Sequence, residues 1–292
     1  MGDIMKIGIG PYYYKSYGGV TGAERMRRHG YDYLDFDLYA NIYGELYDGD
    51  EAEFVRNTEA LRDKLANEGY LLWQIHGPWV FPVPNATETE RELWFEKCVR
   101  ACHAAQILGV KYMAIHPLMP YPADKPHTKE QAEDVWRINI DFFTRLAAYG
   151  EKHGVYICLE NMPFPDFPIS SSVDIMRVVK TVNHPYFRVC LDTGHANIVK
   201  PSPSESLRII GKEYLKILHV HGNDGKGDYH YNPFDARDTV DWAEFTRALK
   251  EIGFDGVVSL ETAPCPDNHP DLTPEEVEMG LASIAKKIAG IK

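Results

Sequence analysis

The sequence predicts an α/β fold, a single (β/α)8 TIM barrel that spans residues 1–292. Short apolar segments alternate with amphipathic helical segments along the whole chain, and strands joined by crossover helices form parallel sheets. The length of 292 residues suits a barrel, which takes about 250. No linker or shift in composition divides the chain. A doubly wound open sheet is the alternative, but no Gly-x-Gly-x-x-Gly loop follows the first strand.

The first half of the chain supplies four of the eight expected strand–helix units. The expected strands are 6–10, 31–38, 70–75 and 110–115. Each helical segment that follows ends near a glycine, a residue favoured just beyond a helix C-terminus. These helical segments are 21–29, 50–67, 87–108 and 128–153. Thr87 and Glu90 have the spacing of a capping box, which marks where the third of these helices begins.

The second half supplies the other four units. The expected strands are 155–159, 189–191, 215–220 and 257–260. The helices that follow them are expected at 171–182, 204–214, 239–252 and 274–288. After the sixth strand comes Asp192, then a glycine turn and His195. Asp192 is interpreted either as a metal ligand or as a simple cap of the next helix, because Asp-x-Gly is common turn chemistry.

Composition and charge narrow the class of protein. The chain is 44% hydrophobic and 25% charged, ordinary values for a globular protein. No run approaches the roughly 18 apolar residues of a membrane span, and the N-terminus lacks the features of a signal peptide. Five cysteines in apolar or helical contexts are expected to be reduced, as in a cytoplasmic protein. A net charge of −12 argues against a nucleic-acid surface.

Metal-binding residue types follow six consecutive expected strands, the third to the eighth. They are His76, His116, Glu160, Asp192, His221 and Glu261. In a barrel these six side chains lie around one mouth, where the active sites of such barrels are found. A buried carboxylate is costly without a cationic partner, and converging oxygen and nitrogen ligands are typical of a metal site. The sequence therefore predicts a metal centre at this end of the barrel.

The alternation of side chains along a strand predicts a second inward-facing layer, two residues before the first. Its members are Gln74, Ala114, Cys158, Cys190, His219 and Ser259. This layer is small or polar, as expected for residues that support metal ligands. His219 is accordingly assigned to the support or the core. Its position two residues before His221 makes the choice between these two histidines the main ambiguity.

Six motifs carry a resemblance to a known family. They are Leu159-Glu-Asn-Met-Pro163, Leu191-Asp-Thr-Gly-His-Ala196, His219-Val-His-Gly-Asn-Asp224, Asp228-Tyr-His230, Asp241-Trp242 and Ser259-Leu-Glu-Thr262. Together they resemble the xylose-isomerase-like superfamily. This superfamily includes sugar phosphate isomerases and epimerases, inosose dehydratases and the endonuclease-IV-type apurinic (AP) endonucleases of family 2. The resemblance extends from the first strand to the eighth.

The resemblance implies a set of metal ligands. The four residues that hold one divalent ion in the epimerases of the superfamily match Glu160, Asp192, His221 and Glu261. Further ligands that the endonucleases use for a second and third ion, and that sugar enzymes use for substrate hydroxyls, match His76, His116, His195, Asp228 and His230. The chain is thus expected to bind up to three ions. Mn²⁺ or Mg²⁺ suits the oxygen-rich set, and Zn²⁺ suits the histidine-rich positions.

Three departures from the family pattern bear on the substrate. The family often has Pro-Gly-x-Gly where this chain has Pro233-Phe-Asp-Ala-Arg237. Ketose 3-epimerases usually carry an arginine shortly after the seventh strand, where Lys226 stands here and could bind substrate as a point charge. The chain also lacks a glycine-rich phosphate cradle after strands seven and eight. These departures favour a free sugar or polyol over a sugar phosphate.

Aromatic side chains expected at the mouth suit a sugar ring, which has apolar faces and polar edges. They are Tyr12, Tyr13, Tyr14, Trp79, Phe81, Phe164 and Phe167. Tyr12, Trp79 and Phe164 are predicted to bind substrate. A different interpretation is that these rings pack the loops against one another.

The leading hypothesis is a metal-dependent sugar isomerase or epimerase. Glu160 and Glu261 would transfer the proton, and the ion would stabilise the enediolate. A dehydratase is chemically adjacent, because an enediolate can expel a β-hydroxyl. A metal-dependent phosphodiesterase acting on abasic DNA is a second hypothesis, and a non-catalytic binding barrel is a third. The expected partner is a small carbohydrate, with neither membrane nor nucleic acid involved and the oligomeric state open.

Overall fold

The structure is a computed structural model that describes residues 5–10, 20–38, 49–79, 85–262 and 271–291. Eight parallel strands form one sheet in the order β7-β6-β5-β4-β3-β2-β1-β8. The strands are β1 (Lys6–Ile9), β2 (Tyr33–Asp37), β3 (Leu72–His76), β4 (Tyr112–Ile115), β5 (Tyr156–Glu160), β6 (Phe187–Asp192), β7 (Leu215–His219) and β8 (Val257–Leu260). The predicted (β/α)8 barrel is confirmed.

The barrel closes between β7 and β8 through residues at and just beyond the strand ends. Val220, immediately after β7, forms a parallel bridge with Leu260. The Val220 N–H donates to the Ser259 carbonyl at 2.8 Å, and the Glu261 N–H donates to the Val220 carbonyl at 3.0 Å. These bonds bring the end of β7 and the end of β8 to one rim. His221 and Glu261 therefore occupy adjacent positions on the rim at the barrel mouth.

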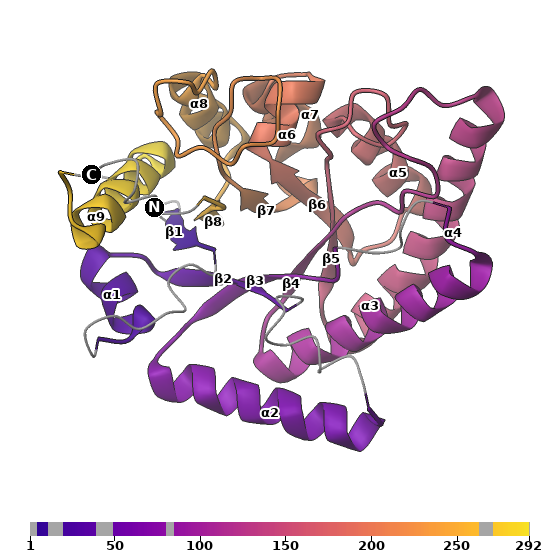
Figure 1. Cartoon of the computed structure of the whole chain (residues 1–292), viewed down its shortest axis with the longest axis horizontal. Coiled ribbons are helices and arrows are strands. Elements are labelled where there is room, and N and C mark those ends of the chain that lie inside the picture. The colour runs from indigo at the N-terminus through magenta and orange to yellow at the C-terminus, as the bar shows by residue number, and fades with distance from the viewer. Residues whose placement is uncertain (1–4, 11–19, 39–48, 80–84, 263–270, 292) are drawn as a thin grey trace.

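The helices surround the strands, as Figure 1 shows. They are α1 (Gly22–His29), α2 (Glu51–Glu68), α3 (Glu88–Leu108), α4 (Lys129–His153), α5 (Ser172–Val182), α6 (Thr193–Val199), α7 (Pro203–Tyr214), α8 (Trp242–Ile252) and α9 (Pro274–Ala289). The predicted capping box of Thr87 and Glu90 begins α3. Left-handed glycines end α1, α2, α3 and α4, as expected from the sequence.

The short helix α6 lies where the sequence predicted a glycine turn after the sixth strand. The backbone turns into a helix directly after Asp192, whose side chain accepts a hydrogen bond from the His195 N–H at 2.6 Å. This bond caps the helix N-terminus. Asp192 thus has the capping role that was one of its two interpretations, and its second carboxylate oxygen still faces the barrel mouth.

The supporting layer predicted from strand alternation is buried in the barrel interior, including Gln74, Cys190 and His219. Ala114, Cys158 and Cys190 pack there with Ile217 in a small cluster separate from the main core. The main core fills the space between the sheet and the helices. Four cysteines are buried free thiols, as predicted, and Cys265 lies outside the described residues.

A buried ion pair joins the first helix to the last, which lie next to each other in Figure 1. The Arg25 guanidinium, on α1, donates to both carboxylate oxygens of Glu278, on α9, at 3.1 and 2.7 Å. Both side chains are more than nine-tenths buried. Because α9 packs on both β1 and β8, the pair joins the first and last units of the barrel. Among the described helices, none is both long and apolar enough to cross a membrane.

Candidate metal centre

The nine predicted ligands gather at the carboxyl ends of the strands, in groups whose ligand atoms lie within 4.8 Å of one another. The first group is Glu160, Asp192, His219 and Glu261. The second is His76, His116 and Glu160, and the third is His195, His221, Asp228 and His230. Glu160 is common to the first two groups. Asp192 connects the first to the third, because its Oδ2 lies 3.0 Å from the Nε2 of His221.

Glu160, at the end of β5, is the centre of the arrangement. Its Oε2 lies 3.4 Å from the Nε2 atoms of both His76 and His116. This oxygen is buried and has no hydrogen-bond partner among the described residues. Burial alone would raise the pKa of Glu160, but the neighbouring histidines, His219 above all, outweigh it and hold the pKa well below its usual range. A buried anionic oxygen facing two imidazole nitrogens fits a divalent cation.

Three of the site histidines are oriented by backbone carbonyl groups. The Nδ1 atoms of His76, His195 and His230 lie 2.7–2.8 Å from the carbonyl oxygens of Gly77, Asn161 and Glu261. A carbonyl only accepts hydrogen bonds, so Nδ1 carries the proton in each ring. Nε2 is then the atom that faces the site, and this outer-shell arrangement is usual for histidines that bind metals.

In each of these three rings, Nε2 faces a carboxylate. The Nε2 of His76 lies 3.4 Å from Glu160, and those of His195 and His230 lie 3.3 and 3.2 Å from Asp228. Burial lowers the pKa of all three histidines, but the neighbouring carboxylates outweigh it. They raise the pKa of His76 and His230 to about 9 and that of His195 to about 10. Protons therefore occupy the positions that a cation would take.

The pKa of His116 is set mainly by burial, whereas that of Asp228 is set mainly by its neighbouring histidines. For His116, burial outweighs the charge of Glu160, and the pKa is lowered. A neutral His116 presents a lone pair to a cation without first losing a proton. For Asp228, burial is outweighed by the hydrogen bonds of His195 and His230, and the pKa is far below its usual range. Asp228 is therefore an anion between two imidazolium rings.

His221 lies in a space that only a glycine neighbour leaves open. Its ring stacks on that of His230, with centroids 3.8 Å apart and an interplanar angle of 6°. A Cβ atom added to Gly194, on α6, would come within 2.0 Å of the His221 ring. The ring therefore reaches Asp192 only because position 194 has no side chain.

His219 occupies the position beside Glu160 and Glu261 that the resemblance assigned to His221. Its Nδ1 lies 2.9 Å from Glu160 Oε1 and 3.4 Å from Glu261 Oε2. Its Nε2 lies 3.5 Å from Asp35 Oδ2, on β2. The first group therefore differs from the expected ligand set at one residue, since it contains His219 in place of His221. Asp35 has no role predicted from the sequence; its only signal is its place opposite Gln74 in the inward-facing register.

Asn161 is a second residue of the site with no role predicted from the sequence. Its amide accepts from the Asp192 N–H at 2.8 Å and donates to the Asp192 carbonyl at 3.0 Å. Its own carbonyl oxygen holds the Nδ1 of His195. Asn161 directly follows Glu160 within the Leu159–Pro163 motif, so its position was the available signal.

Comparison with known proteins places the chain in a family. The family described as xylose isomerase-like TIM barrel matches residues 23–282. The chain belongs to this family. The D-psicose 3-epimerase of Ruminiclostridium cellulolyticum is 30% identical over 142 residues, which are 48% of this chain and 45% of that protein. The inosose isomerase of Bacillus subtilis strain 168 is 30% identical over 161 residues, 53% of this chain and 54% of that one.

The chain thus spans about half the length of these two curated relatives of the xylose isomerase-like barrel. The same fold occurs in the crystal structure described as the IOLI protein with a binding zinc atom. That structure has a TM-score of 0.73 and 22% identity, and covers 98% of each chain. The relatives include a sugar epimerase and an inosose isomerase, and the solved structure shows that the fold is shared over the whole barrel.

The residues predicted to bind substrate are placed unequally in this xylose isomerase-like barrel. Trp79 is 47% exposed, and its Nε1–H donates to Asp37 at 3.4 Å. Phe164 is half-buried and packs against the main core. Lys226 is exposed, on the loop that leads to Asp228. Phe167 is buried and so belongs to the core rather than to an aromatic wall. Tyr12, Tyr13, Tyr14 and Phe81 lie outside the described residues.

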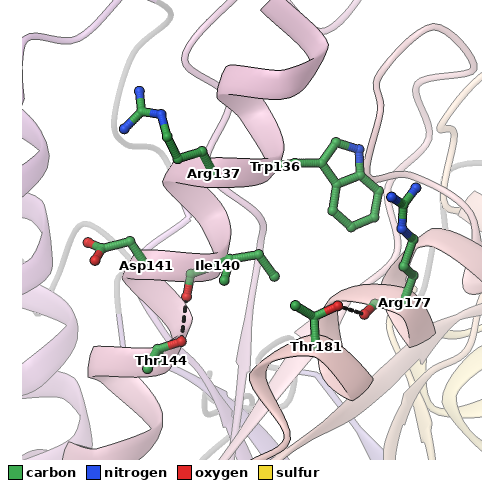
Figure 2. Close-up of a pocket in the computed structure, with 7 residues that line it drawn as sticks. All are labelled: Trp136, Arg137, Ile140, Asp141, Thr144, Arg177 and Thr181. Atoms are coloured by element: carbon green, nitrogen blue, oxygen red, sulfur yellow. Dashed lines mark hydrogen bonds between the residues drawn. The ribbon is translucent and has the colours of Figure 1, made fainter.

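A separate groove of about 500 Å³ lies on the outer surface between α4 and α5 (Figure 2). The Arg177 guanidinium lies over the Trp136 ring at 4.4 Å. The hydroxyl groups of Thr144 and Thr181 donate to carbonyl oxygens of their own helices. No residue of the three ligand groups lines this groove. The chemistry-bearing residues are therefore at the barrel mouth and not in this surface groove.

Proposed function

We propose that this chain is a divalent-metal-dependent isomerase or epimerase that acts on a sugar or a sugar-like polyol. The observation that carries the proposal is the buried carboxylate of Glu160, whose Oε2 faces His76 and His116 and has no hydrogen-bond partner among the described residues. The names of the two curated relatives support a carbohydrate substrate.

The proposed ligands of the principal ion are Glu160, Asp192, His221 and Glu261. Their support is the closeness of the three carboxylates and the 3.0 Å contact between His221 and Asp192. When bound, a divalent ion supplies Lewis-acid stabilisation of negative charge that develops on the oxygen atoms of the substrate. Mn²⁺ or Mg²⁺ suits this oxygen-rich set, and Zn²⁺ suits the histidine-rich second and third groups.

The two glutamates are the proposed acid and base. Glu160 ends β5 and Glu261 follows β8, so the two lie on either side of the residues from β6 and β7. Glu160 is almost fully buried, whereas the Glu261 side chain is 28% exposed and therefore reachable from the mouth. Glu261 would take the proton from the carbon beside the carbonyl. Delivery to the other face of a proton that Glu160 takes from solvent, while Glu261 releases its proton to solvent, gives epimerisation. Return by a single carboxylate to the neighbouring carbon gives isomerisation.

His76, His116, His195, Asp228 and His230 are proposed to bind substrate hydroxyl groups or additional ions. Their grouping into two further sets favours a second candidate function, a phosphodiesterase acting on abasic DNA, because clustered metals suit displacement at phosphorus. The net charge of −12 opposes that candidate, since a duplex surface must neutralise several phosphates. A dehydratase is a third candidate, because its reaction begins with the same removal of a carbon-bound proton.

A substrate screen in D₂O tests the proposal. The protein is loaded in turn with Mn²⁺, Mg²⁺ and Zn²⁺ and incubated with ketoses, aldoses and inososes, beside an abasic-site duplex. We expect solvent deuterium on the carbon next to the carbonyl of at least one sugar, detected by NMR. Phosphodiester hydrolysis breaks no carbon–hydrogen bond. Cleavage of the duplex without exchange on any sugar would therefore overturn the proposal.

A further inference from the structure

His219 is held differently from three other histidines of the site. The Nδ1 atoms of His76, His195 and His230 are each bonded to a backbone carbonyl, which leaves Nε2 facing the site. The two ring nitrogens of His219 instead face carboxylates on opposite sides. Nδ1 lies 2.9 Å from Glu160 Oε1, and Nε2 lies 3.5 Å from Asp35 Oδ2.

Asp35 is fixed below the ligands by residues from two other strands. Its Oδ2 accepts hydrogen bonds from Gln74 Nε2, on β3, at 2.7 Å and from the Ser259 hydroxyl, on β8, at 3.2 Å. Gln74 Nε2 also donates to the Leu218 carbonyl, on β7, at 3.2 Å. Asp35 and Gln74 are both more than nine-tenths buried. Hydrogen bonds from Gln74 and Ser259 therefore fix the Asp35 carboxylate inside the barrel, where it faces His219.

We propose that Asp35 is a positioning residue, which orients His219 so that its imidazole holds Glu160 Oε1 and leaves Glu160 Oε2 to bind the metal ion. This inference rests on the metal site of the proposed function and adds a residue from β2 that the ligand set does not contain. The proposal explains why the two oxygen atoms of Glu160 differ. Oε1 contacts His219, whereas Oε2 has no hydrogen-bond partner among the described residues.

The same geometry assigns different roles to the two histidines around Val220. Both ring nitrogens of His219 face carboxylates, Nδ1 toward Glu160 Oε1 and Nε2 toward Asp35 Oδ2. In this orientation His219 contacts Glu160 directly, and we assign it to holding that carboxylate rather than to the ligand set. His221 has its Nδ1 3.3 Å from the Gly222 carbonyl and its Nε2 toward Asp192, so it can present Nε2 to the ion.

The first test compares Asp35→Asn with a matched control, Ser259→Ala. Both changes remove one partner from the same small network, but only Asp35→Asn removes the carboxylate that faces His219. Zn²⁺ affinity is measured by calorimetry after removal of bound metal. Loss of an outer-shell partner typically weakens metal affinity by about 10–100-fold, and we expect this for Asp35→Asn. We expect a smaller loss for Ser259→Ala than for Asp35→Asn, because Asp35 keeps its carboxylate and its hydrogen bond from Gln74.

A double-mutant cycle separates positioning from general damage to the fold. If Asp35 acts through His219, Asp35→Asn should weaken Zn²⁺ binding in the wild-type background and add little in the His219→Asn background. Equal losses in both backgrounds would show that Asp35 acts by another route and would overturn the inference. Thermal unfolding of each metal-free variant checks that the barrel is folded.

A measurement on the wild-type protein keeps the inference testable even if Asp35→Asn does not fold. The ¹⁵N spectrum of histidine-labelled protein is recorded with and without saturating Zn²⁺, with His219→Asn and His221→Asn variants used for assignment. Neither ring nitrogen of His219 should take the shift of a metal-bound nitrogen when Zn²⁺ is added, whereas Nε2 of His221 should take it. A metal-bound His219 would overturn the inference. No readout uses a sugar, so failure of the substrate screen would count against the proposed function alone.

Discussion

Substitution of Gly194 by alanine probes the proposed role of His221 without changing any ligand. A Cβ at this position would lie 2.0, 2.5 and 2.7 Å from Cε1, Nδ1 and Nε2 of the His221 ring. The ring must move by about 1.4 Å to reach an ordinary contact of 3.4 Å. Metal–nitrogen bonds to histidine are about 2.0–2.1 Å long and vary by about 0.2 Å. A displaced His221 therefore leaves the coordination shell.

We expect Gly194→Ala to weaken Zn²⁺ binding at the principal site by at least about 100-fold, more than the loss of a typical outer-shell partner. The backbone tolerates the change, since Gly194 is within α6 and does not have a positive φ. Overpacking should cost about 1–3 kcal/mol of the free energy of unfolding of the metal-free protein. Calorimetric titration with Zn²⁺ and urea unfolding measure the two effects separately.

The matched background is His221→Ala, which removes the ring that Gly194→Ala would displace. In this background the added Cβ meets no imidazole, so Gly194→Ala should have little further effect on Zn²⁺ affinity. Wild-type affinity in the single Gly194→Ala variant would refute the assignment of His221 as a ligand. The first ligand group, which contains His219 in place of His221, would then be the better description of the site.

Three further predictions concern metal content, pH and stability. Asp192→Ala should lose the principal ion and the activity together, whereas His195→Ala should keep that ion; elemental analysis decides, and unchanged metal content in Asp192→Ala would contradict the ligand set. For His76, His195 and His230, the folded-state pKa of about 9–10 exceeds the ordinary 6.5, so their contribution to stability is complete below about pH 6.5 and is lost as the pH rises through 9–10. The Tm of metal-free protein should therefore fall between pH 7 and 10, and a Tm that rises over this range would contradict the ion pairs. Glu278→Ala removes the bidentate partner of buried Arg25 and should cost about 3–5 kcal/mol in urea unfolding. Asp255→Ala, which breaks the exposed pair with Lys212, should change the free energy of unfolding very little, and equal losses would argue against burial as the cause.

Much of the fold could be predicted from local sequence signals, above all the glycines that end helices. Gly30, Gly69, Gly109 and Gly154 end their helices in the left-handed conformation, at the predicted helix ends. The helix α6 has no glycine just beyond its end, and Gly194 in its first turn lowers helix propensity; its local signal is the cap, Asp192. That cap is itself one of the proposed ligands, so the same residue supports two interpretations.

The sequence predicted which residues come together at the barrel mouth but not the contacts among them. Strand alternation places both His219 and His221 toward the barrel axis, and the choice between them depends on side-chain orientation and on the bridge of Val220 to Leu260. Asp35 could not be recognised from its own segment, since it acts through His219, which lies 184 positions along the chain. Long-range contacts of this kind leave no periodic signal in one sequence.

The most direct test of the central claim is solvent exchange by the wild type and Glu261→Gln, both at saturating metal ion. Glutamine keeps nearly the same shape as glutamate and one oxygen that can bind metal, but it cannot accept the proton. If Glu261 is the base, incorporation of deuterium into the reactive sugar should fall by about 10²–10⁴-fold while the Tm changes little. Exchange at the wild-type rate in Glu261→Gln, with the sugar still turned over, would contradict the proposed mechanism.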